Sequence, residues 1–77
     1  MADIAAMTEL VYQQLQAAGT HALKEGVSIF LPQYLDAQEI ESLQMNLYLR
    51  SRTRYEITHH LGERRIWVRE KLYDHRR

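Results

Sequence analysis

Residues 55–71, YEITHHLGERRIWVREK, decide the fold, because apolar and polar side chains alternate on both sides of Leu61 and Gly62. Alternation with a period of two is typical of β-strands, and a glycine between two such runs is typical of a hairpin turn. The sequence therefore predicts a β-hairpin with strands over 55–59 and 64–71.

The apolar residues predict how the two strands pair. Placing Ile57 opposite Ile66, and Tyr55 opposite Val68, gathers four apolar side chains on one face of the hairpin. A shift by one residue would divide this set between the two faces, which disfavours that alternative. The opposite face then carries polar and charged side chains and the only tryptophan of the chain: Glu56, Thr58, Arg65, Trp67 and Arg69.

Before the hairpin, the chain predicts a helix, a helical turn and a strand. Apolar residues recur at spacings of three and four over 2–18, which is typical of one helical face, and Gly19 is a suitable stop. A short helical turn is expected over 20–25, capped by Thr20. The β-branched, apolar run 27–31 predicts a short strand, because it follows a glycine and precedes a proline.

A longer central helix is predicted to begin after Asp36, since Glu39 three residues later completes a capping-box pattern. One apolar stripe of this helix is expected to face the core, and a second stripe lies beside it. A helix that is apolar over so wide an arc needs cover on more than one side. We therefore expect a homodimer or partner interface at three residues of the second stripe: Met45, Tyr48 and Leu49.

Together these elements predict one α+β domain over 1–77, ordered as helix, short strand, long central helix and C-terminal β-hairpin. Residues 72–77 are expected to form a short basic tail. A long helix followed by a basic hairpin resembles the C-terminal end of winged helix-turn-helix domains, and this resemblance is one of element order alone.

The net charge of zero conceals an uneven distribution of charge. Up to Tyr48 the chain has one base and six acids, a net of −5, and from Leu49 onward it has nine bases and four acids, a net of +5. Such asymmetry favours an anionic partner for the basic part or contacts between copies, whereas the alternative is an unevenly charged solvated surface. Eight of the nine bases are arginines, which suit bidentate contacts to phosphates or carboxylates.

The first functional hypothesis is a small regulatory protein that binds nucleic acid, with DNA favoured over RNA. Several arginines within reach of successive phosphates, together with an aromatic side chain for stacking, are typical of such binding. If the central helix continues far enough, Arg50 and Arg54 share one face. The predicted contacts follow the end of the central helix and the hairpin: Arg50, Arg52, Arg54, Arg64, Arg65, Trp67 and Arg69.

The second hypothesis is a protein–protein interaction module, such as a small inhibitor or adaptor of phage or plasmid type without a nucleic-acid role. Tryptophan flanked by arginines is also the composition of a protein interface hot spot. The two hypotheses use overlapping residues, so the sequence leaves both open.

Other classes are disfavoured. The chain has no cysteine, and His59 and His60 would point to opposite faces of a strand, so no metal site or cofactor is expected. No nucleophile or phosphate-loop motif is present, so we expect neither an enzyme nor a small-molecule substrate. No segment is apolar and long enough to span a membrane, and we expect a cytoplasmic protein.

Overall fold

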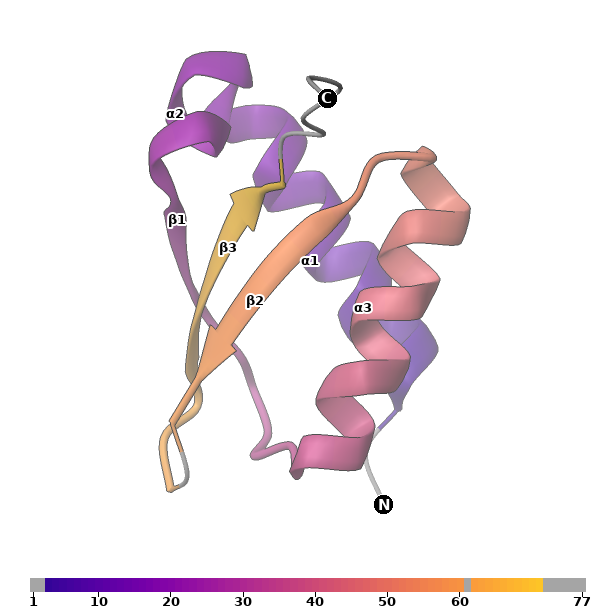
Figure 1. Cartoon of the computed structure of the whole chain (residues 1–77). Coiled ribbons are helices and arrows are strands. Elements are labelled where there is room, and N and C mark those ends of the chain that lie inside the picture. Colours follow the sequence, from indigo (N-terminus) through magenta and orange to yellow (C-terminus); the bar gives the residue numbers. More distant parts are fainter. Residues whose placement is uncertain (1–2, 61, 72–77) are drawn as a thin grey trace, which may run out of the picture.

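The computed structural model describes residues 3–60 and 62–71, and it confirms the predicted α+β class (Figure 1). The predicted tail over 72–77 lies outside the described residues. The elements follow one another in the order α1 (Ile4–Ala18), α2 (Thr20–Glu25), β1 (Val27–Phe30), α3 (Ala37–Ser51), β2 (Tyr55–His59) and β3 (Arg65–Glu70).

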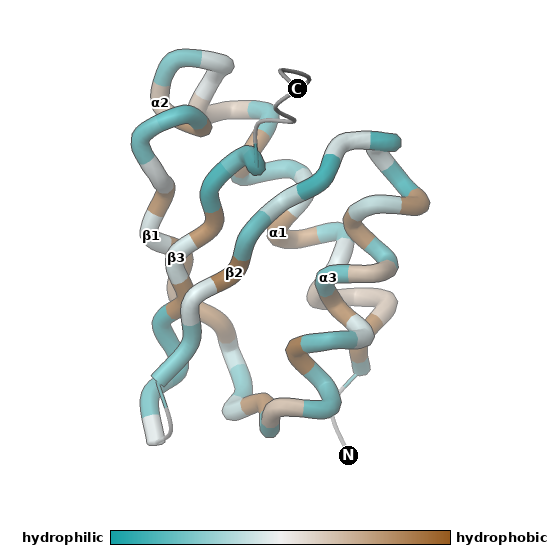
Figure 2. Tube along the Cα trace, in the orientation of Figure 1, coloured by the Kyte–Doolittle hydropathy of each residue, from teal (hydrophilic) through white to brown (hydrophobic). Residues whose placement is uncertain are grey.

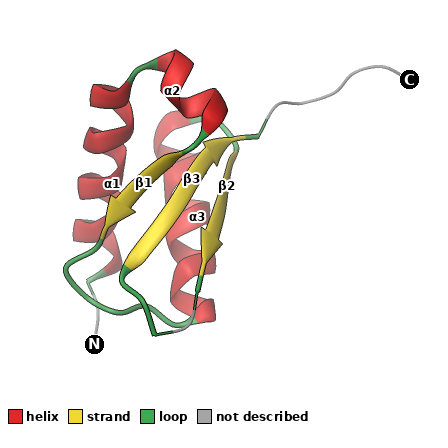
Figure 3. Ribbon diagram, turned by 90° about the vertical axis from the view of Figure 1, so that its left-hand side faces the viewer, coloured by secondary structure: helices red, strands yellow, loops and turns green. Residues whose placement is uncertain are grey.

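The three strands form one antiparallel sheet in the order β1-β3-β2. The strand before the central helix therefore pairs with the second strand of the hairpin, a pairing that the sequence did not predict. Helices α1 and α3 lie on one face of this sheet (Figure 3), so the molecule has two layers. Apolar segments recur along both helices and the strands (Figure 2).

The core lies between these layers. It is built from side chains that follow a helical period in α1 and α3 and a period of two in the strands, as burial on one face of each element requires. Its fully buried members include Val11, Leu15, Ile29, Leu31, Leu43, Leu47, Ile66 and Val68.

The predicted hairpin register is wrong by two residues. In the structure Ile57 pairs with Val68 and His59 pairs with Ile66. The connection between the strands is longer than predicted, with a turn in which the backbone N–H of Glu63 donates to the carbonyl oxygen of His60 (3.2 Å) and Gly62 has a φ of +83°. A shift of two residues leaves each side chain on its own face, so the predicted division into apolar and polar faces is confirmed.

Helix α1 begins two residues later than predicted, because Asp3 is its N-cap and accepts a hydrogen bond from the backbone N–H of Ala6 (3.1 Å). Gly19 ends this helix, as predicted, with a φ of +90° that most residues adopt only with strain. The predicted cap of the short helix α2 is wrong. Gly19 occupies the N-cap position without a side-chain bond, and Thr20 is the first residue of the helix.

The capping box of α3 is confirmed. The Asp36 carboxylate accepts from the backbone N–H of Glu39 (2.8 Å), and the Glu39 carboxylate accepts from the backbone N–H of Asp36 (3.0 Å). The helix then buries Leu43 and Leu47 against the sheet and ends at Ser51, followed by the C-cap residue Arg52, whose φ of 61° is left-handed.

Replacing Asp36 by alanine should lower the free energy of unfolding by about 1 kcal/mol, because the side-chain acceptor for the first turn of α3 is lost. Asp36→Ser, which keeps an acceptor, should cost clearly less. Urea denaturation followed by circular dichroism measures both values. Equal losses for the alanine and serine variants would contradict a capping role.

Candidate nucleic-acid interface

Among the described residues, no helix covers the second face of the sheet. We call this second face, on which the side chains point away from α1 and α3, the open sheet face. Its residues are Ser28, Phe30, Glu56, Thr58, Arg65, Trp67 and Arg69. Two large aromatic side chains are accessible on it, since Phe30 is 57% and Trp67 46% exposed. Because exposing apolar surface to water is unfavourable, an accessible aromatic pair on one face of the sheet favours a binding surface.

The strand register determines which side chains are neighbours on the open sheet face. Phe30 stands opposite Arg65, and Trp67 stands in the central strand between Ser28 and Thr58. Phe30 and Trp67 are thus diagonal neighbours on adjacent strands, a relation that separates residues by about 7–8 Å. A hollow of about 290 Å³ beside Trp67 is lined in addition by Glu25, Gly26, Glu56, Thr58 and Arg69.

Arg64 lies at the margin of this face. Its guanidinium is 4.8 Å from the ring centroid of Phe30 and 5.7 Å from that of Tyr34, and it donates a hydrogen bond to the carbonyl oxygen of Pro32 (3.2 Å). Cation–π contacts at these distances are attractive. Arg64 therefore supports the aromatic group around Phe30, while part of its charge remains accessible.

The sequence analysis missed Phe30 and Tyr34. Phe30 could have been found, because it lies at an outward position of the predicted strand over 27–31, but only if that strand had been assigned to the same sheet as the hairpin. Tyr34 follows the strand in a loop and is 64% exposed. No periodic pattern places a loop residue, so sequence reasoning had no signal for it.

Arg69 forms an ion pair across the two strands of the hairpin with Glu56 (Figure 1 shows β2 and β3 side by side). Both side chains are about half exposed, at 57% and 48%. Pairs this accessible contribute only about 0–1 kcal/mol to stability. The pair can therefore open toward a phosphate at small cost, and Arg69 remains available to an anionic ligand.

Arg50 is engaged within the protein. Its guanidinium donates two hydrogen bonds to the Glu9 carboxylate, from Nη2 (2.8 Å) and Nε (3.2 Å), and it lies 4.5 Å from the ring centroid of Tyr12. The hydrogen bond and the charge of Glu9 raise the pKa of Arg50 above its ordinary value. This contact joins α3 to α1, so a structural role accounts for Arg50.

The condition under which Arg50 and Arg54 would share one helical face is not met, because α3 ends at Ser51 and Arg52 turns the chain. Arg54 precedes β2, and its guanidinium is 5.8 Å from the ring centroid of Tyr48. The seven predicted contacts therefore divide into two groups. Arg64, Arg65, Trp67 and Arg69 belong to the open sheet face or its margin, whereas Arg50, Arg52 and Arg54 belong to the end of α3.

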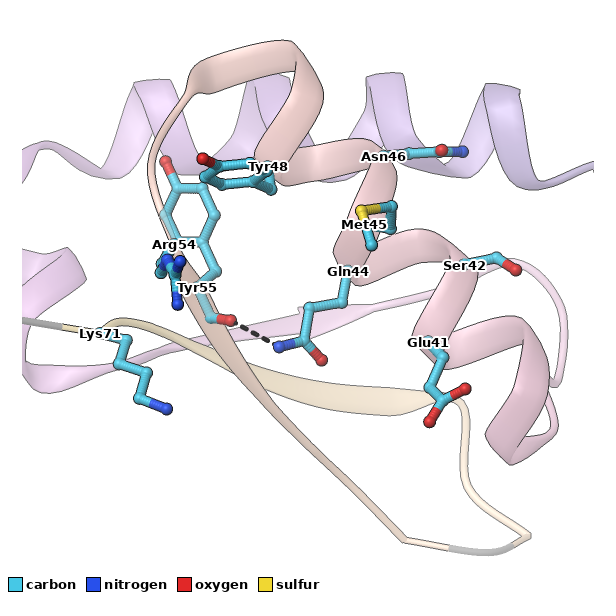
Figure 4. Close-up of a pocket in the computed structure, with 9 residues that line it drawn as sticks. All are labelled: Glu41, Ser42, Gln44, Met45, Asn46, Tyr48, Arg54, Tyr55 and Lys71. Atoms are coloured by element: carbon cyan, nitrogen blue, oxygen red, sulfur yellow. Dashed lines mark hydrogen bonds between the residues drawn. The ribbon is translucent and has the colours of Figure 1, made fainter.

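The outer side of α3 carries the predicted interface residues. Met45 and Leu49 are each 58% exposed, and Tyr48 is 36% exposed. A groove of about 740 Å³ runs along α3 beside β2, and Met45 and Tyr48 line it whereas Leu49 does not (Figure 4). The side-chain Nε2 of Gln44 donates to the carbonyl oxygen of Tyr55 (2.9 Å) and connects the two walls.

In residues 3–60 and 62–71, no three His, Asp or Glu side chains come close enough together to hold a metal ion. Over the same residues, no helix has the length and apolar character needed to cross a membrane.

The comparisons with known proteins were negative. The chain matches no known family model, no curated protein sequence and no solved structure. The assignment of function therefore rests on the open sheet face and its chemistry.

Proposed function

We propose that this protein binds single-stranded nucleic acid on its open sheet face, with DNA as the first candidate, and acts as a small cytoplasmic regulatory protein. The observation that carries the proposal is Trp67, a half-exposed tryptophan in the central strand of the open sheet face with arginines on both sides along its own strand. Bases stack on such a ring whatever their sequence.

The residues of the face have distinct roles. Trp67 and Phe30 offer rings for two bases, and their diagonal spacing of about 7–8 Å suits neighbouring bases of an extended strand. Arg65 and Arg69 supply charge for the phosphates on either side of Trp67. In the hollow beside Trp67, the carboxylates of Glu25 and Glu56 can accept hydrogen bonds from an exocyclic amino group, such as that of cytosine.

A single strand is favoured over a duplex for a structural reason. A protein that bound duplex DNA in the manner of a winged helix domain would use the outer side of α3. That side would then need basic side chains to contact the phosphates. That side instead carries Glu41, Met45 and Leu49, all exposed. Arg65, Arg69 and the rings of Phe30 and Trp67 lie on the opposite layer of the molecule, where a strand with unstacked bases can reach them.

The experiment is an anisotropy titration of a fluorescein-labelled oligo(dT) at low salt, with oligo(rU) and a DNA duplex of equal length as comparisons. Oligo(dT) should bind more tightly than the duplex, and log K should fall with log[salt] with a slope of about −2, as expected for Arg65, Arg69 and the partly accessible Arg64 at about −0.7 each on a single strand. Absence of binding to both single strands at low salt would overturn the proposal.

A parallel experiment tests the second hypothesis, that this protein binds a protein partner. Lysate is treated with nuclease and passed over the immobilised protein and over its Trp67→Ala variant. The interaction-module hypothesis would replace the present proposal under two conditions: the unchanged protein retains one defined protein that the Trp67→Ala variant does not retain, and neither oligonucleotide binds. Tryptophan and arginine are the typical anchors of protein interfaces.

Arg65 and Arg52 provide a matched pair of exposed arginines, one on the open sheet face and one at the end of α3. Arg65→Gln should weaken binding to oligo(dT) about 3- to 10-fold at low salt and reduce the salt slope by about 0.7, because one phosphate contact is lost. Arg52→Gln should change neither value. Equal effects of the two substitutions in the same titration would refute a localised interface and point to non-specific charge attraction.

A further inference from the structure

The hollow beside Trp67 lies at the end of the sheet where α2 leads into β1. Helix α2 contacts β3 at this end (Figure 3). One step beyond the pairing of Val27 with Val68, the strand register puts Gly26 level with Arg69. A Cβ atom added at Gly26 would meet no other atom within 4 Å. The absence of a side chain at Gly26 therefore leaves space beside Arg69, and this space is part of the hollow of about 290 Å³.

Three charged side chains line this hollow. Glu56 stands directly opposite Arg69 on β2, and an ion pair joins the two. Glu25 lies on the other side of Arg69, because it precedes Gly26 at the end of α2. The Glu25 carboxylate is 3.6 Å from Nε2 of His21, and both side chains are largely exposed, at 75% and 92%, so this contact leaves the carboxylate accessible. Arg69 thus stands between a carboxylate that it already binds and a second one that a ligand can reach.

We propose that this hollow binds a guanine base of the single strand, stacked on the ring of Trp67. The guanine carbonyl oxygen O6 accepts a hydrogen bond from Arg69, and the adjacent N1–H and 2-amino groups donate to the two carboxylate oxygens of Glu25. Glu56 is a positioning residue, because its ion pair holds the guanidinium of Arg69, which keeps further N–H groups for a phosphate. The inference rests on the proposed function and assigns a preferred base to the same face.

The pattern of donors and acceptors on the bases favours guanine. Guanine presents two adjacent donors, N1–H and the 2-amino group, next to the acceptor O6. Adenine and cytosine have an acceptor beside their amino group, and thymine has one N–H between two carbonyl oxygens. An ionised carboxylate only accepts hydrogen bonds, so both oxygens of Glu25 pair with guanine, whereas one at most pairs with any other base. A bidentate contact of this kind discriminates between bases by about 5- to 150-fold.

The test compares fluorescein-labelled oligo(dT) strands of equal length that differ only at one central position, which carries dT, dG, deoxyinosine, dC or dA. Their affinities are measured by anisotropy titration at low salt. The dG strand should bind at least about fivefold more tightly than oligo(dT). Deoxyinosine lacks only the 2-amino group of guanine, so its strand should lose most of this gain. The dC and dA strands should also bind more weakly than the dG strand.

Glu25→Gln should bring the ratio of the two dissociation constants, for the dT and dG strands, close to one, because the amide replaces one acceptor by a donor. Glu41→Gln is the matched control, since it neutralises the same charge at an exposed position of α3 on the opposite layer. It should leave the ratio unchanged, and circular dichroism checks the fold of both variants.

The outcomes separate this inference from the proposed function. A dG strand that binds no more tightly than oligo(dT) would overturn the inference alone, and so would a preference for dG that survives in Glu25→Gln. If none of the strands binds at low salt, the inference and the proposed function are both wrong.

Discussion

Trp67→Ala is expected to weaken binding of oligo(dT) about 5- to 150-fold, because stacking of one base on an aromatic side chain is worth about 1–3 kcal/mol. The fold should not change, since Trp67 is 46% exposed and points away from the core. Binding is measured by anisotropy at low salt, and folding by circular dichroism and urea denaturation.

Conservative replacements distinguish stacking from a general loss of surface. Trp67→Tyr and Trp67→Phe should recover most of the affinity, whereas Trp67→Leu, which is apolar without a π-face, should behave like the alanine variant. Leu49→Ala, on the opposite layer, should bind like the unchanged protein. If the leucine variant binds as tightly as the aromatic ones, stacking on Trp67 is not part of the interaction.

The single tryptophan also provides a direct signal from the site. A base stacked on its ring should quench the intrinsic fluorescence, and the quenching should saturate with the same dissociation constant as the anisotropy change. Binding without any change in fluorescence would place the nucleic acid elsewhere on the protein, for example at the end of α3.

Leu43→Ala should have the largest effect on stability. Its side chain is fully buried between α3 and the sheet, and the loss of burial together with the remaining cavity costs about 2–5 kcal/mol. A domain of this size has a total of only about 5 kcal/mol. The variant should therefore be largely unfolded or unfold at very low urea concentrations.

Leu49→Ala is the matched control, because it removes the same atoms from the same helix at a side chain that is 58% exposed. Its loss should remain well below 1 kcal/mol, as is usual for surface positions. Urea denaturation at one protein concentration measures both variants. Equal losses of stability in the two variants would contradict the assignment of Leu43 to the core and of Leu49 to the surface.

Local patterns were sufficient to predict the elements of this fold. The capping residues Asp36 and Glu39 and the stop at Gly19 act within one turn of chain, so their effect can be read from neighbouring residues. The division of the hairpin into two faces was also predictable, because period-two alternation survives a register error of two. The register itself depends on the turn around Gly62, whose conformation the apolar pattern does not specify.

Contacts between distant parts of the chain could not be predicted in this way. Pairing of β1 with β3 brings Phe30 next to Arg65, and that pairing decides that the open sheet face carries two aromatic rings. Arg50 and Glu9 are 41 residues apart in the sequence. The charge pattern alone therefore predicted Arg50 as a nucleic-acid contact, although Arg50 pairs with Glu9 of α1 in the structure. The basic character of the C-terminal third was thus visible, whereas the division of its arginines between two surfaces required the fold.

The strand order has a consequence for the synthesis of the chain. Strand β3 is central in the sheet, but it is the last of the three strands to leave the ribosome. Until it emerges, β1 and β2 have no strand between them to pair with, while α1 and α3 can already pack against each other. A premature stop before residue 65 would remove every strand pairing at once and leave a helical fragment with its apolar side uncovered, a species prone to aggregation.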